Sequence, residues 1–130
     1  MITQNLKNKW LNYPWLPNQG LDHFIHPDDL DKLKGQGIGL LLCIEDAGGA
    51  YIMVKNNVFT GSVMRSGVKS ILPPPAFLWD QTIKLKSKPI LPCFIKDFFW
   101  HHKDEKYYYR LVVDKKFDKK RYSKEELDLP

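Results

Sequence analysis

The chain has 130 residues and a formal net charge of +5 at pH 7, from 20 Lys and Arg against 15 Asp and Glu. Hydrophobic residues make up 43% and charged residues 27%, a balance that is typical of a globular protein and excludes a disordered, collagenous or membrane-spanning chain. We expect a soluble cytoplasmic protein without membrane contact, since no signal-peptide pattern opens the sequence and Cys43 and Cys93 alone cannot build a disulfide scaffold.

Residues 1–36 are expected to form an aromatic lead followed by one short helix. Two prolines three residues apart prevent a continuous helix in the lead, so its aromatic side chains should cover part of a core without regular structure. These aromatic residues are Trp10, Trp15 and Phe24.

The segment 26–35 has the features of a helix. Its proline, Pro27, suits the first helical position, and its final residue, Gly35, can adopt the left-handed conformation that ends a helix. Aspartates early in the segment and lysines late in it complement the helix dipole. This segment therefore predicts the single short N-terminal helix of the chain.

Short extended runs begin at Gly37 and define a first small β-unit over residues 37–75. They alternate with turn signals and predict a four-strand meander. The predicted strands are 38–45, 51–55, 58–63 and 68–72. Three consecutive prolines at 73–75, which no central strand can contain, provide a stiff spacer and a boundary between two units.

The same pattern repeats over residues 76–130. The predicted strands are 82–86, 93–101, 107–114 and 117–122. The last of these is rich in Lys, which hinders pairing with a foreign sheet. Ser123 and Glu126 form a capping-box pattern that predicts a one-turn helix near the C-terminus. Sheets this small cover their apolar faces only by curling into barrels, and two such short units are expected to pack together.

Residues 77–129 resemble the small five-stranded SH3-like barrels of the Tudor and chromo-barrel type. The resemblance lies in the strand that ends in Phe98-Phe99-Trp100, the hairpin into Tyr107-Tyr108-Tyr109, and the closing Arg121-Tyr122. The N-terminal half looks like a looser copy. The segment 25–30, IHPDDL, is also similar to one found before a β-domain in uncharacterised bacterial proteins. The resemblance implies a mainly β fold of two SH3-like units and a binding module, with no catalytic residues to transfer.

No metal site, cofactor or enzymatic activity is expected. His101 and His102 are adjacent on a predicted strand and point to opposite faces, so they cannot easily share one ion. Cys43 and Cys93 lie in apolar runs that are typical of buried, unreactive thiols. The glycine-rich segment 35–39 follows a helix and opens a strand, the reverse of a dinucleotide-binding loop.

An aromatic and basic character marks the C-terminal half, where residues 76–130 carry 13 Lys and Arg against 9 acids. Aromatic rings beside cations suit the binding of an acidic protein or peptide, in a toxin-neutralising or assembly-adaptor role. Alternation predicts that Tyr107, Tyr109, Leu111 and Val113 share one face, toward the core, that Tyr108, Arg110 and Val112 face outward, and that Phe98 and Phe99 lie on opposite faces. The predicted contact face consists of Trp100, Tyr108, Arg110 and Tyr122. The alternative that the other half of the chain covers these aromatic residues stays open.

Nucleic-acid binding is the second hypothesis. The residues that would carry it are Lys84, Lys86, Arg110, Lys119, Lys120 and Arg121. Binding through such residues would weaken steeply with salt, by counterion release. Acidic residues alternate with these lysines, however, at Asp104, Asp114 and Asp118, whereas a nucleic-acid surface usually shows a cleaner basic stripe. We therefore place protein binding first.

Overall fold

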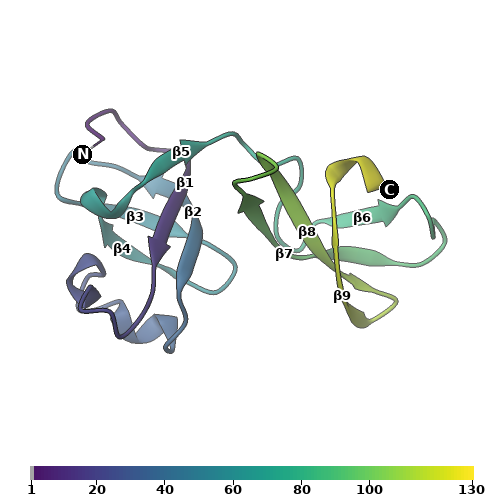
Figure 1. Cartoon of the computed structure of the whole chain (residues 1–130), viewed down its shortest axis with the longest axis horizontal. Helices are drawn as coiled ribbons and strands as arrows, with labels where there is room; N and C mark the ends of the chain where they lie inside the picture. Colours follow the sequence, from purple (N-terminus) through teal and green to yellow (C-terminus); the bar gives the residue numbers. More distant parts are fainter. Residues whose placement is uncertain (1) are drawn as a thin grey trace. The chain divides into compact units, whose positions relative to one another are not determined.

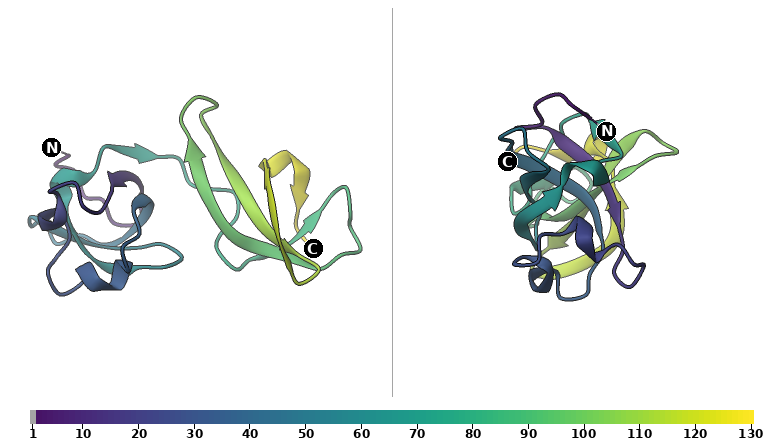
Figure 2. Two further views of the ribbon diagram at one scale, coloured as in Figure 1. Left: turned by 60° about the horizontal axis from the view of Figure 1, so that its bottom comes forward. Right: turned by 90° about the vertical axis from the view of Figure 1, so that its left-hand side faces the viewer.

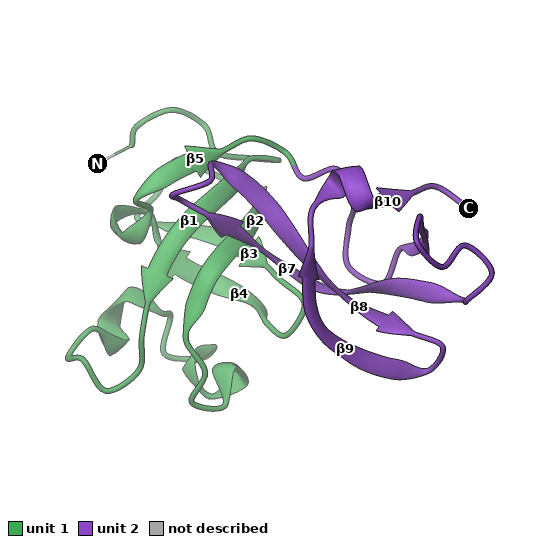
Figure 3. Ribbon diagram, turned by 45° about the vertical axis from the view of Figure 1, so that its right-hand side comes forward, with its two compact units in different colours: residues 1–74 green, residues 75–130 purple. Residues whose placement is uncertain are grey.

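The computed structural model describes residues 2–130 and forms two compact units, of which the first ends at Pro74 and the second is Pro75–Pro130 (Figure 3). Each unit contains one antiparallel sheet of five strands. The mainly β fold expected from the sequence is confirmed. The division falls within the triple proline, and the packing of the units on each other stays a prediction.

The first sheet has the order β4-β3-β2-β1-β5 (Figure 1). Its strands are β1 (Trp10–Trp15), β2 (Ile38–Glu45), β3 (Tyr51–Lys55), β4 (Thr60–Met64) and β5 (Ser70–Leu72). The expected meander is wrong in one respect, because β5 pairs with β1 and not with β4. Figure 2 shows this sheet curling around the interior of the unit.

Strand β1 corrects the expectation of an irregular lead. It lies between β2 and β5 and pairs with both. The register with β2 shifts between Asn12 and Trp15, so Pro14 falls in the irregular stretch, where its missing N–H breaks no ladder bond. A proline that argues against a central strand is therefore accommodated by a bulge.

The second sheet repeats this order as β10-β6-β7-β8-β9. Its strands are β6 (Thr82–Leu85), β7 (Cys93–His101), β8 (Lys106–Val113), β9 (Lys116–Tyr122) and β10 (Leu127–Asp128). In both units the first strand lies between the second and the last. A single 3-10 turn precedes the last strand in each, η3 (Arg65–Gly67) and η4 (Lys124–Glu126). The two units therefore share one topology.

Neither predicted helix forms as an α-helix, because residues 2–130 contain only short 3-10 turns. In the segment 26–35 only Leu30–Leu33 (η2) is helical, and Lys34 is already left-handed, with φ 52°. Asp29, expected in the first turn of the helix, is instead drawn toward β4, where its carboxylate accepts the Ser62 N–H at 2.8 Å. The capping box of Ser123 and Glu126 is present, but it closes a 3-10 turn.

No helix within residues 2–130 has the length and apolarity that crossing a bilayer requires.

The other short turn, η1 (Asp22–Phe24), precedes an isolated bridge between Ile25 and Val63. This bridge ties the long connection between β1 and β2 to the far edge strand, β4. The connection thereby contributes Ile25 to the interior of the unit, where it is 1% exposed.

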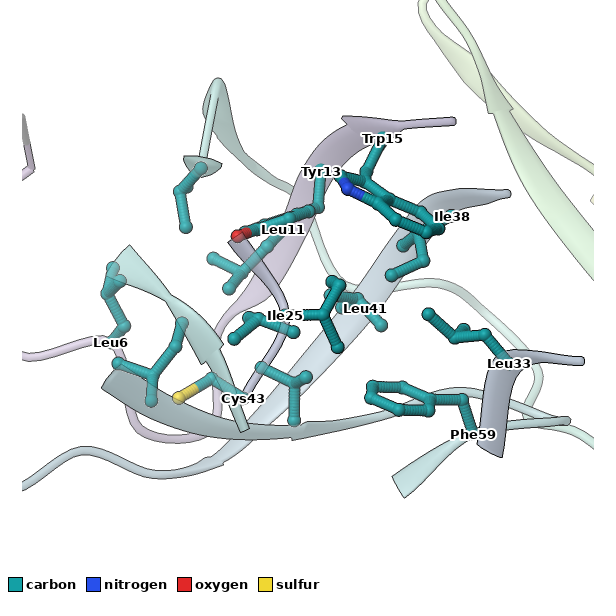
Figure 4. Packing of buried hydrophobic residues seen from close by; sticks show 14 residues of the cluster. Leu6, Leu11, Tyr13, Trp15, Ile25, Leu33, Ile38, Leu41, Cys43 and Phe59 are labelled. Carbon is teal, nitrogen blue, oxygen red and sulfur yellow. The ribbon is translucent and has the colours of Figure 1, made fainter. Parts of the chain in front are cut away.

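The interior of the first unit is largely aliphatic (Figure 4). Fully buried side chains of β1, β2 and β3, such as Leu11, Leu41 and Ile52, form its centre. Tyr13 is the largest of the side chains that are less than 2% exposed in this unit, and its hydroxyl donates to the Met64 carbonyl at 2.7 Å. Burial raises the pKa of this tyrosine strongly, so it stays neutral across the physiological range.

A buried ion pair joins the loops at one end of the first unit. The Asp46 carboxylate accepts hydrogen bonds from the Arg65 guanidinium, from the Leu6 N–H at 2.8 Å and from the Gly48 N–H at 2.9 Å. Arg65 also donates to the carbonyls of Gly49 and Gln4. The hydrogen bond from Arg65 is the main reason that the pKa of Asp46 falls to about 2. The pair therefore holds the N-terminal segment, the β2–β3 turn and η3 together.

The interior of the second unit combines aliphatic side chains with a cluster of aromatic rings. The Phe98 ring contacts the rings of Tyr107 and Tyr109 at 5.8 and 5.5 Å between centroids, and Trp79 stacks on it at 4.8 Å. The Tyr109 hydroxyl accepts the Ala76 N–H at 2.9 Å, which fixes the chain just after the triple proline to β8. Ring packing thus supplies much of the burial in a unit of few residues.

Candidate binding face of the second unit

Alternation along β8 separates two faces of the second sheet. Tyr107, Tyr109, Leu111 and Val113 are buried, as the sequence pattern predicted. The residues between them are only half-buried and lie on the opposite side, which we call the outer face. Strands β7 and β8 form one long hairpin, drawn in green in Figure 2, and β9 pairs along the other side of β8. The outer face therefore extends over three long strands.

One end of the outer face is apolar. The strand registers place Thr82, Phe94, Val112 and Phe117 in a row across β6, β7, β8 and β9. Phe94 and Phe117 are 37% and 51% exposed, although phenylalanine is usually buried. Beside this row lies an open groove of about 230 Å³, which Pro92, Phe94, Val112 and Lys115 help to line. The row offers apolar surface to a partner.

The next row along the strands is charged. Arg110 in β8 and Arg121 in β9 are directly opposite each other. Like charges in this position repel by roughly 0.2–1 kcal/mol. Asp97, the β7 neighbour of Arg110 in the same row, accepts from its Nε at 2.8 Å. Among residues 2–130, no ion pair of this kind involves Arg121.

Aromatic rings of the following row hold both arginines. The Arg110 Cζ lies 5.3 Å from the centre of the Phe99 ring, and the Arg121 Cζ lies 4.3 Å from the centre of the Tyr108 ring. Phe99 and Tyr108 are themselves cross-strand partners. Guanidinium groups stack favourably on aromatic faces, so the rings orient two cations that would otherwise separate. The arrangement is a preformed pair of arginines.

The tip of the β7–β8 hairpin fixes the ring of Tyr108. The Tyr108 hydroxyl donates to the Asp104 carboxylate, and the His101 Nδ1 accepts the Asp104 N–H at 3.1 Å. The hydrogen bond lowers the pKa of Asp104 and raises the pKa of Tyr108. Lys106 adds a cation 5.1 Å from the centre of the same ring. Tyr108 is therefore held at its hydroxyl and has two cations, Lys106 and Arg121, near its ring.

The four residues of the predicted contact face do not come together. Tyr108 and Arg110 lie on the outer face. Tyr122 is 5% exposed and lies on the opposite face as the register partner of buried Tyr109. Its hydroxyl donates to Asp118 at 2.7 Å, and burial is the first reason that its pKa rises to about 12. Trp100 is half-buried, with its ring against the inward-facing Tyr107.

Sequence reasoning missed Phe94, Phe99 and Phe117 as members of the outer face. Phe94 and Phe99 each differ in strand parity from a buried neighbour, such as Phe98 beside Phe99, whereas neither neighbour of Phe117 in its strand is buried. Alternation predicted that Phe98 and Phe99 lie on opposite faces, but the face that is exposed depends on register and on bulges. In β7 the register shifts between Ile95 and Asp97, which brings Asp97 and not Lys96 beside Arg110. A bulge is not visible in the sequence pattern.

The six residues of the nucleic-acid hypothesis are also divided. Lys84, Arg110 and Arg121 share the outer face. Lys120 lies over the Tyr122 ring at 4.8 Å and pairs with Glu126 at 3.7 Å, on the other side of the sheet. Lys119 is exposed within the irregular stretch of β9, and Lys86 follows the end of β6, where its N–H donates to the Glu126 carbonyl. The structure therefore shows no continuous stripe through all six.

The groups considered for chemistry lie apart from this face or inside the units. Cys43 and Cys93 are buried free thiols, and desolvation is the main cause that raises the pKa of each. Across residues 2–130, no three His, Cys, Asp or Glu side chains gather in an arrangement that could hold a metal ion.

The fold and this face together define a small, two-unit, mainly β protein. A protein-family model, described as "Family of unknown function (DUF6960)", matches residues 2–128, and the chain therefore belongs to this family. The match agrees with the expectation of an uncharacterised family. Neither the curated proteins nor the solved structures contain a match to the chain.

Proposed function

We propose that the protein is a non-catalytic binding module that contacts an acidic protein or peptide through the outer face of the second unit. The observation that carries this proposal is the pair of Arg110 and Arg121, opposite each other in register and stacked on Phe99 and Tyr108. A partner carboxylate placed between the two guanidinium groups would relieve their repulsion. The hydrogen bonds and stacking that hold the arginines reduce the side-chain entropy that binding would cost.

The surroundings of the arginines favour a protein partner. Interfaces gain most of their energy from aromatic residues and Arg, and the outer face presents both. The apolar row with Phe94 and Phe117 adds surface that a partner can bury, because these rings are exposed at 37% and 51%. Lys84 and Lys106 lie on the same face, where positive charge speeds encounter with an acidic partner.

Each unit is, in this proposal, an SH3-like barrel in a bacterial cytoplasmic protein. The shared strand order, the pairing of the last strand with the first and the 3-10 turn before the last strand support this assignment. Small barrels of that type bind peptides and other partners, and toxin neutralisation and assembly are roles within the same class. The fold by itself is weak support for function, so the proposal depends on the face.

Nucleic-acid binding is the alternative, favoured by the shared face of Lys84, Arg110 and Arg121. Acidic groups on that face weaken it. Asp97 already neutralises part of the charge of Arg110, and Asp128 is the register partner of Lys84. A phosphate backbone would meet these carboxylates together with the cations, which makes a separate acidic side chain the better match.

Titration of the labelled full chain with poly-L-glutamate and with a twenty-residue oligothymidine, followed by NMR, tests the proposal. We expect poly-L-glutamate to shift the signals of Arg110, Arg121 and Tyr108, and Arg121→Gln to weaken its binding about tenfold. Lys119→Gln removes the same charge from an exposed position in the same strand and should leave poly-L-glutamate binding unchanged.

Two results would overturn the proposal. One is the absence of any shift with poly-L-glutamate at about 50 mM salt, where electrostatic binding is strong. The other is tighter binding of oligothymidine that both Arg121→Gln and Lys119→Gln reduce and that falls steeply between about 50 and 200 mM salt, which would favour the nucleic-acid alternative.

A further inference from the structure

We infer that the partner segment is an extended acidic peptide in which one apolar side chain lies two residues from a carboxylate. This inference rests on the proposed function and adds the chemistry and spacing of the partner. The apolar side chain would enter the groove beside Phe94 and Val112, and the carboxylate would lie between Arg110 and Arg121.

The spacing follows from β8. Val112 belongs to the apolar row and Arg110 to the charged row, so the two rows are two residues apart on the same strand and face. Two residues of an extended chain span about 6.6 Å. An extended peptide that runs along β8 has the same distance between alternate side chains. If one of its residues lies over the apolar row, the residue two positions away therefore lies over the charged row.

The volume of the groove favours a side chain of moderate size. The groove of about 230 Å³ is open to solvent, and Phe117, beside it in the row, is half-exposed. A leucine placed there would bury its own surface and part of two phenylalanine rings. The mainly apolar walls of the groove disfavour any charged side chain inside it, and Lys115 repels a cationic one.

The charges on the face select an acidic peptide over a neutral or basic one. Arg121 stacks on Tyr108 without an ion pair among the described residues, so its guanidinium can still pair with a carboxylate from outside. Farther along the same direction lie His101 and Lys106, which are register partners. The Lys106 ammonium favours a second carboxylate beyond the first and repels a basic side chain.

Three end-blocked peptides test the spacing by NMR titration of the full chain. The first is Glu-Ser-Leu-Ser-Glu, which is symmetric and places a carboxylate two residues from Leu in either chain direction. The second, Ser-Glu-Leu-Glu-Ser, has the same composition with the carboxylates adjacent to Leu. The third, Glu-Ser-Ser-Ser-Glu, lacks the apolar side chain. We expect the first peptide to bind about fivefold more tightly than either of the others.

Variants locate the binding. Phe94→Ser should abolish the preference for the first peptide over the third, and Phe117→Ser, at the more exposed end of the row, should reduce it. Leu78→Ser removes an equally exposed apolar side chain of the same unit outside the groove and should leave all three affinities unchanged. Arg121→Gln should weaken the first and third peptides by a similar factor.

The outcomes separate this inference from the proposed function. Equal affinities for the three peptides, together with Arg121-dependent binding of poly-L-glutamate, would overturn the spacing and leave the acidic-partner proposal in place. If the preference for the first peptide persists in both Phe94→Ser and Phe117→Ser, the apolar side chain does not bind in the groove, and that part of the inference is wrong. No binding of the peptides or of poly-L-glutamate would remove both proposals together.

Discussion

The two units share one strand order but differ in how they are stabilised. All eight glycines of the chain lie at positions 20–67, in the first unit, and the second unit has none. The first unit buries a mainly aliphatic cluster and an ion pair between Asp46 and Arg65, whereas the second adds a cluster of aromatic rings around Phe98 to its aliphatic side chains. One topology is therefore compatible with two quite different solutions for the interior.

The outer faces differ as well, and this difference bears on function. The corresponding rows of the first unit pair Tyr51 with Met64 and Met53 with Ser62, and they contain no arginine. The single arginine of that unit, Arg65, is buried and serves the loops. The second unit places its two arginines outside, on rings. The binding face thus comes from side chains that only one of the two sheets carries, and not from the topology.

Removing the buried carboxylate should have the largest effect. Asp46→Ala leaves Arg65 as an unpaired buried charge and takes the acceptor from two backbone N–H groups, so we expect a loss of about 3–5 kcal/mol. Asp97→Ala breaks the analogous pair of the second unit, whose side chains are 42% and 27% exposed, and should cost below about 1 kcal/mol. Urea denaturation measures both, and similar losses would contradict the contrast.

The substitution Gly67→Ala, which adds one methyl group, should lower the free energy of unfolding of the first unit by about 3 kcal/mol. A Cβ at this position would lie 2.3 Å from the Tyr13 ring and hydroxyl, which are held by the hydrogen bond to Met64. Gly39→Ala is the matched control, because nothing lies within 4 Å of a Cβ there. Amide exchange should show loss of protection in the first unit only. Loss in both units would mean that they unfold as one.

The strands were the most predictable feature of both units. The predicted ranges 38–45, 51–55 and 93–101 are the observed β2, β3 and β7, because apolar runs between turn residues fix such strands locally. The strand β1 was missed because its proline depends on a bulge, and its neighbours β2 and β5 are far away in sequence. The α-helix predicted at 26–35 does not form, and Asp29 instead accepts a hydrogen bond from the Ser62 N–H of β4.

The candidate site was only half predictable, for a related reason. Alternation correctly separated Tyr108 and Arg110 from the buried Tyr107 and Tyr109. It gave no register between strands, so it could not show that Arg121 is opposite Arg110 or that Tyr122 is turned inward. Residue type and parity are local properties, whereas the pairing of two arginines is a property of the sheet.

Acid should affect the first unit before the second. The pKa of Asp46 is about 2 in the folded protein, below the ordinary value near 3.9, so its contribution is complete above the ordinary value and disappears as the pH falls toward 2. We expect a loss of about 2 kcal/mol across this interval, seen as faster amide exchange in the first unit. Asp104 in the second unit also has a lowered pKa, but it is exposed and its effect should be screened. Simultaneous acid unfolding of both units would contradict this expectation.

The absence of glycine in the second unit leads to the smallest predicted effect. Its β8–β9 turn has two residues, Asp114 and Lys115, between the paired Val113 and Lys116, and both have positive φ, 49° and 67°. Two-residue turns of this geometry favour glycine, since a Cβ costs energy in the left-handed region. Lys115→Gly should therefore stabilise the second unit by roughly 1 kcal/mol. Lys116→Gly, one residue on, lies in the strand and should destabilise it by about 0.5–1 kcal/mol. Urea denaturation measures the change in the free energy of unfolding for both substitutions. Because both replace Lys by Gly, changes of opposite sign would show that backbone conformation decides the outcome. Equal signs would mean that the lost lysine charge dominates.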